Sequence, residues 1–307
     1  MALLSFGASQ FDAHASPRAD PDRLEGHVRT LAEDLRPRDA DHPERLAPVA
    51  EYIEAQLALH TDRLADQPYA VEGTTVRNVI ACFGPETGER IIVGVHHDTA
   101  GPHPGADDNA SGVAGLLELA QLLDGVTLQG PVDLVSYPLE EPPYFSRNEM
   151  GSAVHAQALK EQGVAVRAML ALEMIGYYTN APNSQQFPLF ALRPFYPSEG
   201  TFIAVVGRWG WGQHHLVTTV REGMRGASLP VHSINAPRIV PGVAFSNHLN
   251  YWHAGYDAVM ITDTAFYRNP HYQSPSDTPE TLDYDRMAQV VDGVFGAIAA
   301  LEDNDSA

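Results

Sequence analysis

The sequence predicts a three-layer α/β fold, in which a mixed, mainly parallel sheet carries helices on both faces. Two observations lead to this prediction. Apolar runs of strand length alternate with longer segments in which apolar residues recur every three or four positions, as on the inner face of a helix. In addition, the run RIIVGV (90–95) is apolar on both faces, which is typical of a central strand covered by helices on two sides.

The elements follow one another in a regular order. A helix is predicted over 20–35, where Leu24, Val28 and Leu31 share one face, and a second helix over 43–60. The rest of the chain is predicted as strands at 75–84, 90–95, 132–139, 167–178, 201–207 and 257–264, with helices at 111–123, 150–163, 213–225 and 283–301. The sequence leaves open whether the proline- and glutamine-rich loop 179–197 closes over a site or mediates self-association.

Length and the absence of repeats bound the domain organisation. An α/β chain of 307 residues is long enough for one large core. Residues 1–20 are predicted to form an N-terminal arm, and residues 21–307 a single catalytic domain.

Composition excludes several classes of partner. The net charge of −20 opposes binding to phosphate backbones and to anionic membranes, so neither nucleic acid nor a membrane is an expected partner. Cys82 is the only cysteine, which excludes an intramolecular disulfide and a thiolate zinc cluster. No apolar run has the length of a membrane span, and the first residues lack the basic start of a signal peptide, so a cytoplasmic location is predicted.

Ionisable residues follow the predicted strands, at the points where the strands end. They are His96, His97 and Asp98, then Glu140 and Glu141, then Glu173, then Asp263. Ligands of such sheets bind beyond the carboxyl ends of the strands, and packing does not explain why each apolar run ends in acidic or histidine residues. The loop VHHDTAGPHPGADDNASG (95–112) adds two more aspartates among glycines and prolines.

These residue types are typical of metal-assisted hydrolysis. A histidine nitrogen and several carboxylate oxygens bind zinc or a similar divalent ion, which activates water. A spare glutamate beside the metal serves as general base and then as general acid. Other hydrolytic and phosphate-binding classes fit less well, because Ser111 lacks the G-x-S-x-G context and GADDNASG lacks the lysine of a phosphate loop.

Four ordered motifs resemble those of a known family. The segments VHHD…PGADDNASG, LEEPPYF, LEMIGYY…NSQ and TDTAFYRNPHYQSPSDTPETLD are similar to the zinc-dependent exopeptidases of the co-catalytic aminopeptidase family, from about His27 to the last helix. The resemblance implies that His96 and Glu173 bind one metal, that Asp108 bridges to a second, and that Glu141 binds the second. It also implies that Asp98 orients His96.

The same resemblance assigns the groups that act on substrate. Glu140 would be the general acid/base, and Tyr272 would stabilise an oxyanion. Asp107 would shape the loop, and a cis peptide is expected at Asp108–Asn109.

The chain departs from the family pattern at two positions. Gln273 stands where a second metal-binding histidine is usual, and Asn247 stands where an aspartate is usual. The Asp108–Glu141–Gln273 site would then offer only oxygen ligands, which suit Mn²⁺ or Mg²⁺ better than zinc. A shifted His271 is the alternative that would restore an imidazole.

Histidines and tryptophans outside this ligand set are expected to have other roles. His97, His103 and His248 are expected in loops or beside the metal, without binding it. Trp209 and Trp211 either line a substrate pocket or pack at a strand-to-helix turn.

The sequence therefore predicts a metal-dependent exopeptidase, an aminopeptidase acting on small peptides with a free N-terminus. It would use one or two zinc ions, with Mn, Co or Mg at the Gln273 site as the alternative. A single-metal hydrolase and a non-catalytic metal- or peptide-binding protein stay open, because Gln273 replaces a ligand. The oligomeric state is left open.

Overall fold

A computed structural model describes residues 19–303, in which eight strands form one sheet. The strand order is β1-β2-β4-β3-β5-β8-β6-β7. The strands are β1 (Leu64–Val71), β2 (Thr74–Phe83), β3 (Arg90–His96), β4 (Val132–Tyr137), β5 (Val166–Glu173), β6 (Ile203–Arg208), β7 (Val231–Ala236) and β8 (Ala258–Thr262).

The middle of the sheet is parallel. Strand β3 pairs in parallel with β4 and β5, β5 with β8, and β6 with β7. The pairs β1–β2, β2–β4 and β6–β8 are antiparallel. The predicted mixed, mainly parallel sheet is confirmed, and the carboxyl ends of β4, β3, β5 and β8 meet at one edge.

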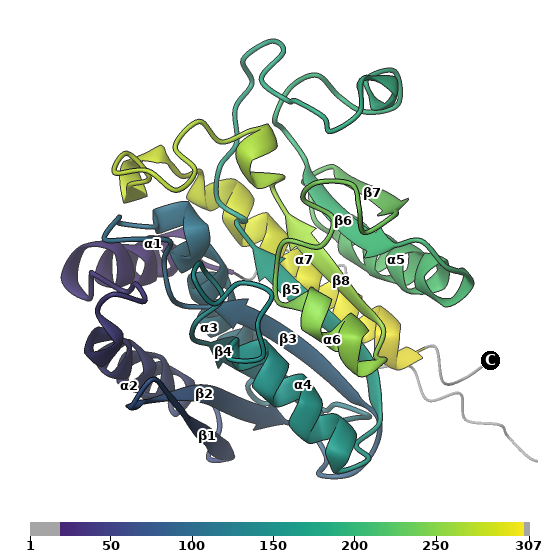
Figure 1. Cartoon of the computed structure of the whole chain (residues 1–307). Coiled ribbons are helices and arrows are strands. Elements are labelled where there is room, and N and C mark those ends of the chain that lie inside the picture. Colours follow the sequence, from purple (N-terminus) through teal and green to yellow (C-terminus); the bar gives the residue numbers. More distant parts are fainter. Residues whose placement is uncertain (1–18, 304–307) are drawn as a thin grey trace, which may run out of the picture.

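Helices cover both faces of the sheet (Figure 1). Along β3, Ile91 and Val93 pack into the core that α1, α2, α3, α5 and α7 share, whereas Ile92 packs into the core with α4 and α6. This alternation is the period of a strand buried on both sides. The helices are α1 (Pro21–Arg29), α2 (Leu46–Leu57), α3 (Gly112–Leu123), α4 (Gly151–Glu161), α5 (Trp211–Gly223), α6 (His248–Ala254) and α7 (Tyr284–Asp303).

The structure differs from the sequence prediction at several elements. Strands β1 and β7 and the short helix α6 were not predicted. The predicted strand 167–178 ends at Glu173, because Met174 takes a left-handed backbone conformation with φ 51°. This reversal turns the chain away from the sheet edge directly after Glu173.

The ends of the chain bear on two further predictions. Of the predicted arm, residues 1–18 lie outside the described residues, and Asp20 caps α1 by accepting a hydrogen bond from the backbone N–H of Asp22. The single catalytic domain over 21–307 stays a prediction. Between residues 19 and 303, no helix combines the length and apolar character that crossing a membrane requires. The cytoplasmic location also stays a prediction.

Candidate metal centre

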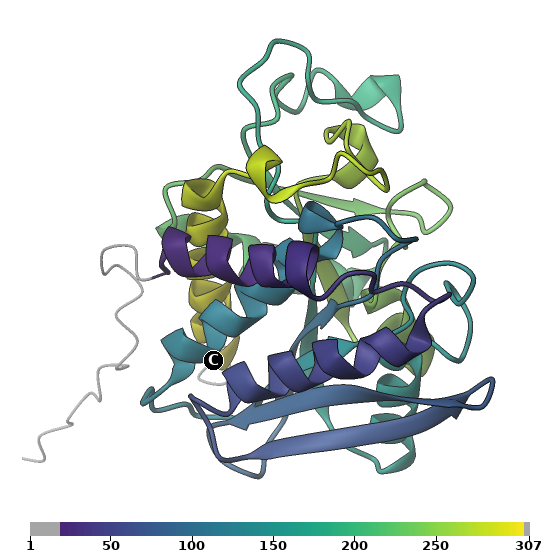
Figure 2. The same cartoon turned by 90° about the vertical axis from the view of Figure 1, so that its left-hand side faces the viewer.

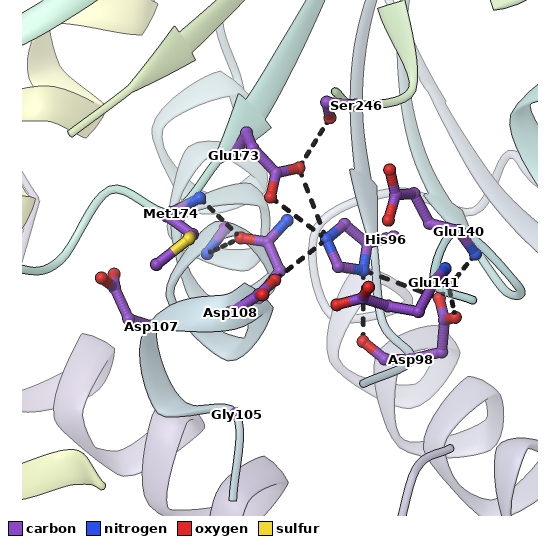
Figure 3. Close-up of polar contacts among 12 residues, drawn as sticks. His96, Asp98, Gly105, Asp107, Asp108, Glu140, Glu141, Glu173, Met174 and Ser246 are labelled. Carbon is purple, nitrogen blue, oxygen red and sulfur yellow. Dashed lines mark hydrogen bonds and ion pairs between the residues drawn. The ribbon is translucent and has the colours of Figure 1, made fainter. Parts of the chain in front are cut away.

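The parallel centre of the sheet brings the predicted site residues together. His96 ends β3 and Glu173 ends β5, the strand beside it, while Glu140 and Glu141 follow β4 on the other side. Asp108 reaches the same point from the loop before α3, and Figure 3 shows these side chains facing one another. Residues far apart in sequence therefore meet because their strands are neighbours.

His96 lies between carboxylates at both ring nitrogens. Its Nε2 lies 3.5 Å from Asp108 Oδ1 and 3.4 Å from Glu173 Oε2. Its Nδ1 lies 3.1 Å from the backbone oxygen of Asp98 and 3.6 Å from Asp98 Oδ1. Burial lowers the pKa of His96, but Glu173, Glu140 and Asp108 together raise it well above its ordinary value.

The cluster of His96, Asp108 and Glu173 fits a bound cation. One ligand atom from each residue lies within 4.8 Å of the others, and all three residues are buried. Asp108 Oδ1 is buried and has no hydrogen-bond partner among the described residues. A buried carboxylate oxygen without a partner is costly, and a divalent ion held between imidazole and carboxylates would satisfy it.

Asp98 joins the loop after β3 to the loop after β4. Its two carboxylate oxygens accept hydrogen bonds from the backbone N–H groups of Glu140 and Glu141, each at 3.0 Å. Burial raises the pKa of Asp98, but the hydrogen bonds from His96 and from these two N–H groups outweigh it and lower the pKa. Asp98 is therefore an ionised anchor for the glutamate pair as well as a neighbour of His96.

Glu140 and Glu141 are buried next to His96 and form a second cluster with it. Burial raises the pKa of both carboxyls well above the ordinary range, with further effects from neighbouring carboxylates such as Asp108. A glutamate held in a dry, acidic site has the proton affinity that a general acid/base needs.

Gln273 contacts Glu141 directly. Its Nε2 donates a hydrogen bond to Glu141 Oε2 at 3.0 Å. His271 does not replace the missing imidazole, since its Nδ1 lies 2.9 Å from Ser276 Oγ and its ring packs edge-on against Tyr177. Tyr272, between them in sequence, has its pKa raised by burial and then by the charges of Asp108 and Glu141.

The loop that carries Asp108 is held by residues that the sequence prediction missed. Asp277 accepts hydrogen bonds from the backbone N–H groups of Asp107 at 2.9 Å and Asp108 at 3.1 Å. Fully buried Arg38 donates to the backbone oxygens of Pro104 and Gly105, both at 3.0 Å. The predicted cis peptide at Asp108–Asn109 is present.

Asp107 and Asp263 form a separate buried pair behind the cluster. Asp107 accepts from the backbone N–H of Gly176 at 2.9 Å and from Asn269 Nδ2 at 2.6 Å, in line with its predicted part in shaping the loop. Burial raises the pKa of Asp107 well above its ordinary value, and Asp263 beside it raises it further. Asp263 thus follows a strand, as predicted, but it lies against Asp107 and outside the metal cluster.

Ser246 supports Glu173. Its Oγ donates to Glu173 Oε2 at 2.6 Å, and both residues are buried. The next residue, Asn247, is fully buried, and neither polar atom of its side chain has a hydrogen-bond partner within residues 19–303. The segment that contains Ser246 and Asn247 thus reaches the site through its serine.

The other predicted candidates lie outside the cluster. His97 Nδ1 lies 2.9 Å from Ser136 Oγ, and His248 Nε2 lies 2.9 Å from the backbone oxygen of Val243. Trp209 is 75 % exposed and does not line the apolar cavity described next, while the side chain of Trp211 lies outside the described residues.

An apolar cavity of about 120 Å³ opens beside the cluster. Glu173 and Tyr272 form part of its wall, and the rest includes Phe187, Phe202, Ala204, Val206, Val243 and Met260. The segment 179–200 contributes Phe187 and rises beyond the carboxyl edge of the sheet (Figure 2). The segment therefore forms part of the cavity wall.

Known proteins resemble this chain in sequence and in fold. The uncharacterized protein YfbL of Escherichia coli K12 is 47 % identical over 291 residues, which are 92 % of this chain and 88 % of that protein. Leucine aminopeptidase 1 of Ajellomyces capsulatus is 25 % identical over 239 residues, and the match spans 56 % of its length. The zinc aminopeptidase BSAP of Bacillus subtilis has the same fold, with a TM-score of 0.74 at 13 % identity over 95 % of this chain and 98 % of that chain.

The match to a family model settles the classification. The model described as Peptidase family M28 matches residues 78–298, which include every metal-cluster residue named above and well over half of the chain. The resemblance that the four motifs predicted is thereby confirmed, as is the α/β fold. The chain belongs to peptidase family M28.

Proposed function

We propose that this member of family M28 is a metal-dependent aminopeptidase that removes the N-terminal residue of small peptides. Membership of the family makes the chain a metallo-exopeptidase. What we propose beyond this is that it cleaves at the N-terminus of the peptide, and that the site residues have the roles given below. The observation that carries it is the buried His96–Asp108–Glu173 cluster, with Glu140 fixed beside it by Asp98.

Zinc is the metal that we propose for this cluster, because zinc binds both imidazole nitrogen and carboxylate oxygen and catalytic zinc sites use three protein ligands. When bound, zinc supplies Lewis acidity and lowers the pKa of a water molecule towards neutrality. His96, Asp108 and Glu173 would hold the ion. Ser246 and Asp98 would keep Glu173 and His96 in place from behind.

Glu140 would move the proton. Its carboxylate would take a proton from the attacking water and then deliver it to the amino group that leaves. Its raised pKa and its burial support this assignment. The hydroxyl of Tyr272, which lines the cavity together with Glu173, would donate a hydrogen bond to the oxyanion.

A free N-terminus suits the charge of the site. Glu140, Glu141, Asp108 and Glu173 place several carboxyl groups at one point, and an ammonium group is attracted to such a cluster. The apolar cavity between Glu173 and Tyr272 would receive the side chain of the first residue, so we propose an apolar first residue.

One tightly held ion is the stoichiometry that we propose. Gln273 adds no imidazole at the second site, and its N–H group, not its carbonyl oxygen, faces Glu141. Mn²⁺, Co²⁺ or Mg²⁺ would bind there weakly if at all.

The test uses wild type and the variant Glu140→Gln, each reconstituted with Zn²⁺, Mn²⁺ or Co²⁺. We expect wild type to release p-nitroaniline from leucine p-nitroanilide and not from its N-acetylated form. We expect Glu140→Gln to lose about 100-fold or more of the rate, because it removes the general base and keeps the shape of the side chain. Equal rates for the two proteins would refute the role of Glu140, and an inert wild type with all three metals would favour a non-catalytic binding protein.

A further inference from the structure

Three phenylalanines stand in a row at the mouth of the apolar cavity. The ring centroids of Phe145 and Phe245 lie 5.8 Å apart, and those of Phe245 and Phe266 lie 6.3 Å apart. The ring of Phe266 lies 5.5 Å from that of Tyr272. We call Phe145, Phe245 and Phe266 the aromatic rim.

Each rim residue lies close in sequence to a residue of the proposed site. Phe145 is in the loop that follows Glu140 and Glu141, and Phe245 directly precedes Ser246, the partner of Glu173. Phe245 and Phe266 also line the cavity, whereas Phe145 is not part of its wall. The rim therefore begins at the cavity and continues beyond it along the side of the glutamate loop.

Packing does not account for the rim. Phe245 is 46 % exposed and Phe266 is 39 % exposed, and neither belongs to a hydrophobic core cluster of the described chain. Single exposed apolar side chains are ordinary on protein surfaces, but contiguous aromatic rings at the edge of a site mark a binding surface. Aromatic pairs at these separations also hold one another in place, so the surface is formed before a ligand arrives.

We propose that the aromatic rim binds the side chain of the second residue of a peptide substrate and selects apolar or aromatic residues there. This inference rests on the proposed aminopeptidase function. With the first side chain in the cavity and the scissile bond beside Glu140, the peptide continues outwards through the mouth. Phe245 and Phe266 border that exit, and Phe145 extends the apolar surface by one further ring.

The experiment compares two dipeptides that share the first residue, leucylglycine and leucylphenylalanine. We expect wild type to have a kcat/KM at least about tenfold higher for leucylphenylalanine, because only its second side chain meets the rim. In the variant Phe145→Ala we expect this ratio to fall roughly fivefold, through the leucylphenylalanine value, with leucylglycine nearly unchanged, because Phe145 is not part of the cavity wall. Phe190→Ala is the matched control, because Phe190 is 80 % exposed and lies outside both rim and cavity.

Several results would overturn the inference while leaving the proposed function intact. One is equal kcat/KM for the two dipeptides in wild type, and another is an equal loss for both dipeptides in Phe145→Ala. If Phe145→Ala keeps the kinetics of wild type but has a lower molecular mass than wild type in light scattering, the rim would instead be a contact between two copies of the chain.

Binding to the Glu140→Gln protein separates this inference from the function itself. If no peptide is hydrolysed, calorimetric titration of both dipeptides still reports on the rim. Tighter binding of leucylphenylalanine that Phe145→Ala abolishes would support the rim, and equal affinities of the Glu140→Gln protein for the two dipeptides would overturn it.

Discussion

The amide of Gln273 donates a hydrogen bond to Glu141 Oε2 over 3.0 Å. The nitrogen faces the carboxylate because a carbonyl oxygen there would repel it. Glu141 thus receives from a side chain a small part of the positive charge that a second metal ion would supply. We therefore expect the residue at position 273 to influence how many ions the site holds.

Replacing Gln273 with histidine should raise the number of tightly bound zinc ions from one to two. An imidazole restores a strong nitrogen ligand beside Asp108 and Glu141. The number is measured by elemental mass spectrometry after reconstitution and desalting, with Gln273→Ala as the control that should stay at one. Two ions already held by wild type would contradict the expected single-ion stoichiometry.

Removing the hydroxyl of Ser246 should weaken zinc binding. Ser246 Oγ holds Glu173 Oε2 at 2.6 Å in a buried setting, and loss of such a supporting hydrogen bond costs about 10-fold in affinity or more. Competition with a chromophoric chelator measures the dissociation constant of Ser246→Ala. An affinity equal to that of wild type would show that Glu173 needs no support from Ser246.

The variant Asp98→Asn should lose stability even without metal. An amide accepts through one atom only, so one of the two N–H groups of Glu140 and Glu141 would face an NH₂ group. We expect a loss of about 2 kcal/mol in the free energy of unfolding, measured by urea titration of the metal-free protein. If the variant is as stable as wild type, the hydrogen bonds to Glu140 and Glu141 do not stabilise the fold, and Asp98 acts only on His96.

Filling the apolar cavity should change the preferred first residue. Ala204 lies in the cavity wall on β6, and Ala204→Met would occupy part of the space of about 120 Å³. We expect kcat/KM for leucine p-nitroanilide to fall about tenfold relative to alanine p-nitroanilide. Thermal unfolding of the variant checks that the sheet has kept its stability. An unchanged ratio would place the first side chain elsewhere.

Acid should destabilise the fold through His155. Burial lowers the pKa of His155 to about 4, below the ordinary value of about 6.5 that it regains on unfolding. Between these values the unfolded chain binds the proton and the folded chain does not, so stability falls as the pH falls. The effect is roughly 1.4 kcal/mol per pH unit at most.

The measurement for His155 is the free energy of unfolding between pH 6.5 and 4.5. His155→Gln should show a shallower fall than wild type. Tyr251→Phe keeps the imidazole and removes only the hydroxyl that lies 2.7 Å from His155 Nδ1, so it should keep the steeper fall. If the free energy of unfolding falls equally steeply with pH in His155→Gln and in wild type, protonation of His155 does not cause the acid destabilisation.

The sequence predicted the central sheet well, because buried parallel strands read as continuous apolar runs. It missed β1 and β7, which are edge strands with exposed and half-buried residues and so lack that signal. One local signal for β1 was available. The turn between β1 and β2 consists of Glu72 and Gly73, both with positive φ, and a glycine in such a two-residue turn indicates a hairpin.

The metal cluster was predictable for a different reason. His96, Glu140 and Glu173 each follow a recognisable strand, and neighbouring parallel strands deliver their ends to one edge. Arg38 and Asp277 were not predictable in this way. Their partners are backbone groups of a distant loop, and no spacing in the sequence indicates which carbonyl or N–H group a buried charge will meet.

The order of the central strands also has a consequence for how the chain acquires its chemistry. Glu140 and Glu173 lie on opposite sides of β3. In sequence, Glu173 is 77 residues from His96 and Glu140 is 42 residues from Asp98. Contacts of such separation form only after long loops have closed, which is the slow part of folding. Zinc binding during refolding would therefore indicate that the central strands have paired. A helix-rich intermediate of refolding would have little affinity for zinc.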